Sequence, residues 1–115
     1  MKKVFIICGV RNASEAYRIK LENYVLDLEK NGINVHLPHR DTDQNARVID
    51  INQANANAIR QADEVHIFYT GSSQGTHFDM GVAFANEKKL VVVENEPYSH
   101  PRCYPKMLED WAGRF

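Results

Sequence analysis

Short apolar stretches alternate with longer amphipathic stretches along the whole chain, and this alternation restricts the fold more than any other feature of the sequence. The run KVFIIC (3–8) has the length of a strand and hardly a polar position, as expected for a strand covered on both faces. Similar short runs recur at 33–37, 64–70 and 90–94. Strands of this kind separated by helices predict an α/β fold with a parallel sheet and right-handed crossovers. Four strands are clear and a fifth is possible, so we expect a four- to five-stranded sheet.

The helices between these strands follow from apolar spacing and from signals at their ends. Ser14 is a suitable N-cap for a first helix that runs to about Asn31, where the pair Asn31-Gly32 stops it. The apolar stripe of this helix consists of Tyr17, Leu21, Tyr24, Val25 and Leu28. Three further helices are expected, over about 47–61, 76–87 and 105–112. Residues 38–46 are polar and predict a loop.

Size and composition exclude several classes of protein. The 115 residues, 43% of them hydrophobic, predict a single domain over 1–115 with a small core. A net charge of −1 gives no field that suits nucleic acid or a membrane surface. There is no apolar run of the length that spans a bilayer, and two cysteines are too few for a disulfide framework. A cytoplasmic protein is expected.

Three loops are expected at the carboxyl edge of the sheet, where ligands bind in parallel α/β folds. They cover residues 8–12, 38–41 and 70–79. Arg11 and Arg40 follow the first and second strands, and either guanidinium can pair bidentately with a phosphate. A solvated loop arginine is an equally good interpretation of each.

The loop GSSQGT (71–76) has the composition of an anion site. Gly71 and Gly75 permit close approach of a ligand to the main chain, and Ser73 and Thr76 offer hydroxyl groups. The loop opens into a helix, whose first N–H groups attract anions. The alternative is an ordinary turn in which Ser73 or Thr76 caps those N–H groups itself.

Asp79 stands just inside this helix. We expect it in the first turn, where the helix dipole favours the ionised carboxylate and hence a nucleophile or a charge stabiliser. The alternative is an ordinary favourable acid near a helix start.

Residues 62–93, ADEVHIFYTGSSQGTHFDMGVAFANEKKLVVV, resemble the nucleoside 2-deoxyribosyltransferase superfamily, which includes deoxynucleoside 5′-monophosphate N-glycosidases. The first strand and the stretch VHLPHR are also similar to the family, so the resemblance covers nearly the whole chain. The positions that match its pattern are Ala62, Asp63, Ser73, Gly75, Asp79, Gly81, Ala83, Lys88 and Lys89.

The resemblance implies a flavodoxin-like three-layer fold, a homodimer and a small-molecule nucleoside or nucleotide as partner, without a cofactor. It places the family's nucleophilic carboxylate on Asp79 and a contact to the 5′-phosphate on Ser73. The carboxylate attacks the anomeric carbon, expels the base and leaves a glycosyl-enzyme that water or a second base resolves with retention. The predicted substrate-binding residues are Cys8, Gly9, Arg11, Arg40, Ser73, Gly75, Thr76 and His77.

Two positions depart from the family pattern. Asp79 replaces a glutamate and is one methylene shorter, and a shift of about 1 Å in reach can cost about a hundredfold in rate. Asn55 replaces a supporting aspartate, and an amide can position a base by hydrogen bonds but cannot transfer a proton. Asn55 and Asp79 are still the predicted catalytic pair.

The five histidines do not predict a metal site. His36 and His66 lie on expected strands, where a hydrogen-bonded core histidine is common, and no Cys/His cluster has zinc spacing. His77 is better interpreted as a pocket wall or a contact to the leaving group.

The sequence therefore predicts an N-glycosidase or deoxyribosyltransferase of nucleosides or nucleoside 5′-monophosphates. Two alternatives stay open: a nucleotide-binding module with little or no turnover, and a distant relative of TIR-type domains that cleaves NAD.

Overall fold

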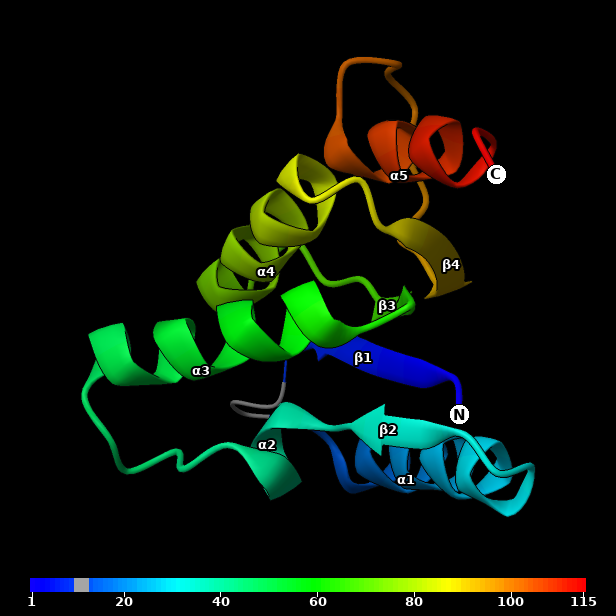
Figure 1. Ribbon diagram of the computed structural model, residues 1–115. Helices are drawn as coiled ribbons and strands as arrows, with labels where there is room; N and C mark the ends of the chain where they lie inside the picture. The colour runs from blue at the N-terminus through cyan, green and yellow to red at the C-terminus, as the bar shows by residue number, and fades with distance from the viewer. Residues whose placement is uncertain (10–12) are drawn as a thin grey trace.

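A four-stranded, all-parallel sheet forms the centre of the computed structural model, which describes residues 1–9 and 13–115 (Figure 1). In space the strands follow the order β2-β1-β3-β4, which is the order of the first four strands of a flavodoxin-like sheet. They comprise β1 (Lys3–Cys8), β2 (Asn34–His36), β3 (Glu64–Phe68) and β4 (Lys89–Glu94). The expected α/β class and parallel sheet are confirmed, and the described residues form four strands.

The strand register aligns the carboxyl ends of β1, β3 and β4. Cys8 pairs with Phe68, and Phe68 pairs with Glu94 across an irregularity between Ile67 and Phe68. The shorter β2 pairs only with the first half of β1, from Lys3 to Phe5. The side chains that follow β1, β3 and β4 therefore emerge close together.

Helices cover both faces of the sheet. They comprise α1 (Glu15–Lys30), the short α2 (Pro38–Asp41), α3 (Val48–Gln61), α4 (Gln74–Ala85) and α5 (Tyr104–Ala112). The Ser14 side chain accepts a hydrogen bond from Tyr17 N at 3.1 Å, so the predicted N-cap of α1 is confirmed. Gly32 follows the helix with φ +78°, a left-handed conformation that glycine adopts without strain.

The start of the expected loop 38–46 is instead the helix α2. Pro38 occupies the first turn, where its fixed φ suits a helix and its missing N–H costs nothing. Asp41 then accepts a hydrogen bond from Leu37 N at 2.8 Å and closes the turn. The prediction of a loop here was wrong at residues 38–41, because it relied on polar composition and not on these effects of Pro38 and Asp41.

Two apolar cores lie on opposite faces of the sheet. Leu21 and Val25 of α1 pack on Val4, Ile6 and other side chains of one face. On the other face, residues of α3, α4 and α5 pack on alternate positions of β1, β3 and β4, namely Phe5, Ile7, Val65, Ile67 and Leu90. Figure 1 shows α1 on one side of β1 and β3, and α3 and α4 on the other. No helix among the described residues is long and apolar enough to span a bilayer.

A buried polar chain links α1 to the sheet. The imidazole of His66 bonds Glu64 Oε1 through Nε2 at 2.7 Å and Tyr24 Oη through Nδ1 at 2.6 Å. Burial disfavours the ionised form of Glu64, but hydrogen bonds from His66 and Lys2 outweigh it and lower the pKa of this carboxyl. A carboxylate accepts from Nε2–H, which leaves Nδ1 to accept from the tyrosine. The expectation of a hydrogen-bonded core histidine on this strand is therefore confirmed.

Protonation of three histidines is expected to lower the stability of this fold as the pH falls below neutrality. Burial lowers the pKa of His36, His39 and His66 below the usual 6.5, so the unfolded chain takes up protons at a higher pH than the folded chain. Their contribution to stability is complete above pH 6.5 and is lost as the pH falls through the lower folded values. Urea unfolding midpoints at pH 7.5 and 5.0, compared between the native chain and His66→Asn, separate this loss from the contributions of other titrating groups. Acidification should cost His66→Asn less stability than it costs the native chain, whereas a His100→Asn control, whose site is exposed, should respond as the native chain does. An equal difference in both variants would contradict it.

Candidate functional site

From β1 the chain goes to β2 on one side, and it then returns to place β3 and β4 on the other side of β1. We call the carboxyl ends of β1 and β3, where this change occurs, the switch point. The segment after β1 leads to α1 on one face, and the segment after β3 leads to α4 on the other. Ligands in open parallel sheets bind at such points. Gly9 and Ser73 meet here so closely that a Cβ on Gly9 would lie 2.9 Å from the Cβ of Ser73. Glycine is therefore required at position 9.

Ser73 is the N-cap of α4. Its hydroxyl oxygen accepts from Thr76 N at 3.1 Å, so the helix begins two residues earlier than the sequence predicted. The hydroxyl proton of Ser73 is not used in that bond. Outside the helix itself, no atom of residues 1–9 and 13–115 lies within 4 Å of where a Cβ on Gly75 would stand, so the helix surface at this residue is open to the rest of the described chain. The capped turn and an anion site are therefore compatible here.

Asp79 lies in the second turn of α4 and not in the first, because the helix starts at Gln74. Its side chain is buried, with 5% of its surface exposed. Among the described residues, neither Asp79 Oδ1 nor the nearby Thr76 Oγ1 has a hydrogen-bond partner, although both atoms are buried. Buried polar groups are normally paired, so two unpaired oxygens one turn apart are a feature to be explained.

Burial raises the pKa of Asp79 to about 7. The sequence predicted the opposite, an ionised carboxylate favoured by the helix dipole. Two differences account for the error: the second turn lies beyond the reach of the dipole, and the loss of hydration outweighs what remains of it. At neutral pH the group exists in both protonation states.

Cys8 connects the two sides of the switch point. Its thiol is free, and burial followed by the nearby Asp79 raises its pKa to about 12. The thiol is therefore protonated and unreactive. Cys8, Gly9, Ser73, Gly75, Thr76 and Asp79 all belong to the segments that meet at the switch point.

Asn55 is buried but is held by a different network. Its Oδ1 accepts from Thr42 Oγ1 at 2.8 Å, and the same hydroxyl bonds His36 Nε2 at 2.9 Å. Within the part of the chain that the structure describes, no hydrogen bond joins Asn55 to Asp79. The amide therefore ties α3 to the end of β2, and its expected catalytic role stays a prediction.

The structure does not bring the guanidinium of Arg40 into this group. It donates to Val35 O at 3.0 Å and to both carboxylate oxygens of Asp41 at 2.9 Å. Glu29 on α1 accepts two further bonds. With these bonds made, Arg40 has little donor capacity left for a phosphate. Arg11 lies outside the described residues.

His77 turns away from Asp79 toward α5. Its Nδ1 bonds the Ser73 carbonyl at 2.8 Å, which only accepts, so Nδ1 carries a proton. Its Nε2 bonds Tyr69 Oη at 3.0 Å, and the ring of Tyr104 lies 4.9 Å from the imidazole. His77 thus fixes the position of the loop that carries Ser73.

Tyr17 was expected in the apolar stripe of α1, and a role for its polar end was not predicted. The residue lies in the first turn of α1, at the switch point, and its ring meets Phe68 edge-on at 6.3 Å. Its Oη is buried and has no hydrogen-bond partner among the described residues. A tyrosine at helical spacing is usually a core residue, so nothing in the sequence alone identified it.

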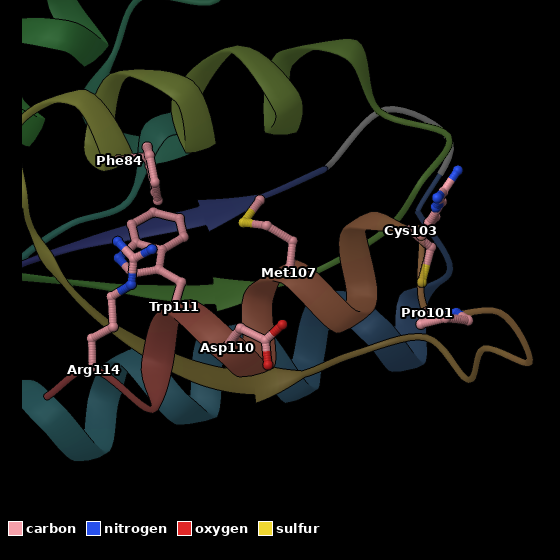
Figure 2. Close-up of a pocket in the computed structure, with 8 residues that line it drawn as sticks. Phe84, Pro101, Cys103, Met107, Asp110, Trp111 and Arg114 are labelled. Atoms are coloured by element: carbon pink, nitrogen blue, oxygen red, sulfur yellow. The ribbon is translucent and has the colours of Figure 1, made fainter.

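A groove of about 400 Å³ lies elsewhere, between the end of α4 and α5 (Figure 2). Phe84, Trp111 and Arg114 gather at one end, with Met107 and Asp110 between them and Cys103. No residue of the switch point lines it. In the described part of the chain, no three His, Cys, Asp or Glu side chains are grouped as a metal site requires.

The chain matches a known family in its sequence pattern. The sequence model of a family described as nucleoside 2-deoxyribosyltransferase matches residues 7–110. No curated protein sequence is similar enough to count as a match.

Several solved structures are similar in fold, among them the following two. The CMP N-glycosidase BcmB from Clostridium botulinum aligns with a TM-score of 0.70 and 23% identity, over 96% of this chain and 83% of the other. A 2-deoxyribosyltransferase from Leishmania mexicana aligns with a TM-score of 0.68 and 17% identity, over 88% of this chain and 69% of the other. At these identities the likeness concerns the fold.

Asp79→Asn is expected to stabilise the protein by a few kcal/mol at pH 8, because the amide cannot ionise in the buried site. The folded pKa of about 7 lies above the ordinary 3.8, so ionisation opposes folding most strongly above pH 7. This penalty vanishes as the pH falls toward 3.8, and the gain should shrink accordingly at pH 5. Urea unfolding at both pH values measures it, with the exposed Asp27→Asn as the control. A loss of stability at pH 8 would show that the carboxylate has a partner.

Proposed function

The chain belongs to the nucleoside 2-deoxyribosyltransferase family, and from that premise we propose that it cleaves or transfers the N-glycosidic bond of a nucleoside or a nucleoside 5′-monophosphate. One observation carries the proposal: a buried, unpaired carboxyl group, Asp79, lies at the switch point beside an open helix start. Unpaired polar groups of this kind are costly to stability and are retained where a ligand uses them.

In the proposed reaction the carboxylate of Asp79 attacks the anomeric carbon of the sugar. The base departs with the bonding electrons, and a glycosyl-enzyme ester remains until water or a second base displaces it. The carboxylate must be ionised to attack, and a pKa of about 7 supplies that form at and above neutral pH. Burial also leaves the carboxylate poorly hydrated, which favours attack on a developing cation.

The 5′-phosphate is proposed to bind at the start of α4. Helix starts attract anions, and the open surface at Gly75 permits close approach. The proton of the Ser73 hydroxyl is available as a donor because the oxygen alone serves the helix cap. The name of the bacterial relative, a CMP N-glycosidase, supports a monophosphate substrate. The name of the other relative, a 2-deoxyribosyltransferase, supports action on the same type of bond, by transfer of the sugar.

A second candidate, a nucleotide-binding module with little turnover, is favoured by the position of Asn55. The family pattern has an aspartate there, and in this chain the amide is bonded to Thr42. Binding of nucleotides by calorimetry without release of base would support this candidate.

The proposal includes a homodimer. Phe84 and Phe115 are exposed by 44% and 58%, and Phe84 lines the groove beside α5. An apolar surface of this kind suits a contact between subunits.

Release of free base from a panel of ribo- and deoxyribonucleoside 5′-monophosphates, followed by chromatography, tests the enzyme. We expect one or more members of the panel to be cleaved, and Asp79→Asn to lose at least about 10³-fold in kcat, as expected for a missing nucleophile. Asp27→Asn serves as the matched control. If no base is released by the native chain, or if Asp79→Asn retains its rate, the enzyme is excluded.

The rate is expected to depend on pH through Asp79. Since attack needs the ionised group, kcat/KM should rise about tenfold per pH unit below about 7 and level off above it. Initial rates between pH 5 and 9 give the profile. A profile that falls through the same range would assign Asp79 as a general acid instead.

A further inference from the structure

The hydroxyl group of Tyr17 is a buried hydrogen-bond donor with no acceptor in the described part of the chain. Burial, followed by the neighbouring Cys8 and Glu94, raises the pKa of this phenol, so it holds its proton at every physiological pH. The ring is fixed edge-on against Phe68, and the start of α1 is capped by Ser14. The hydroxyl is therefore held in place and protonated, and it lacks only an acceptor.

Tyr17 and Asp79 lie on opposite sides of the switch point. Tyr17 comes from the first turn of α1 on one face of the sheet, and Asp79 from α4 on the other. Cys8, at the end of β1, packs in the same cluster as Tyr17 and Phe68. It is also close enough to Asp79 for that carboxyl to contribute to the raised pKa of the thiol. A molecule bound at the end of β1 would lie between the two unpaired groups.

We propose that Tyr17 binds the substrate by donating a hydrogen bond from its Oη to a hydroxyl group of the sugar ring. The inference rests on the proposed function, in which Asp79 attacks the anomeric carbon, because the groups next to that carbon are those of the sugar. Glu94 is paired with Lys20 on α1, so the charges on this side of the switch point are balanced. A neutral hydroxyl group can accept from the phenol there.

Tyr24 provides a built-in comparison, since it lies two turns further along the same helix. Its Oη is bonded to His66 Nδ1 at 2.6 Å, so its hydroxyl is already satisfied within the protein. Removal of the two hydroxyl groups should thus have opposite effects on the stability of the protein. Tyr24→Phe leaves a buried imidazole nitrogen without a partner, whereas Tyr17→Phe removes an unpaired group and keeps the ring contact with Phe68.

Binding of ribose 5-phosphate and 2-deoxyribose 5-phosphate, measured by calorimetry, tests this role without requiring turnover. For Tyr17→Phe we expect Kd to rise about fivefold to tenfold for ribose 5-phosphate, the range of one lost hydrogen bond. A rise confined to ribose 5-phosphate assigns the contact to the 2-hydroxyl, and a rise with both ligands assigns it to a hydroxyl that they share. Tyr24→Phe should leave both Kd values unchanged.

Urea unfolding of the same proteins supplies the second readout. Tyr17→Phe should keep or raise the unfolding midpoint, and Tyr24→Phe should lower it. Unchanged Kd values in Tyr17→Phe, or a midpoint that falls as far as in Tyr24→Phe, would overturn the inference and give Tyr17 a structural role only. Failure of the proposed function is seen separately, as an absence of base release by the native chain that still binds the sugar phosphates.

Discussion

The close contact between Gly9 and Ser73 is the constraint on which the rest of the switch point depends. The chain leaves β1 toward one face of the sheet and leaves β3 toward the other, and only a residue without a Cβ lets the two exits touch. Ser73 in turn caps α4, which fixes where that helix starts and which of its residues face the end of β1. The position of Asp79 on the second turn, and its burial beside Cys8, follow from that start.

At this end of the sheet, several buried polar side chains lack hydrogen-bond partners among the described residues. Elsewhere most of the buried polar side chains are bonded, as in the chain from Glu64 through His66 to Tyr24 and in the chain from His36 through Thr42 to Asn55. The exception among the described residues is His39 on α2, whose buried Nδ1 has no partner. Asp79, Thr76 and Tyr17 are buried at the switch point without partners among the described residues. The cost of several unpaired groups in so small a protein is a large part of an ordinary folding free energy. Their concentration at one point is the physical reason to place the ligand there.

The sequence predicted the fold well because strand and helix periods are local properties. The four strands, the Ser14 cap and the stop at Gly32 were all predicted from a few neighbouring residues each. Errors arose where a local rule competed with another effect, as in α2, where Pro38 and Asp41 build a helix from a polar segment. The protonation of Asp79 could not be predicted, since burial is a property of the folded chain and reverses the effect of the helix dipole. Tyr17 was hidden for the same reason: helical spacing reveals that a ring is buried, but not whether its hydroxyl group is paired. The commitment of Arg40 to Glu29 likewise depends on a contact between distant segments.

The two tyrosines of α1 have consequences for how such a protein can change over generations. Tyr24 anchors the helix through His66, near the amino end of the sheet, so the placement of α1 does not rely on the hydroxyl of Tyr17. Residues near the start of the helix are therefore not required to hold α1 on the sheet. Selection can then exchange the side chain at position 17 while the scaffold stays intact, and under the proposed role of Tyr17 the preference among sugars would change with it. The helix α1 thus carries one tyrosine that folding requires, Tyr24, and one position, 17, that can change.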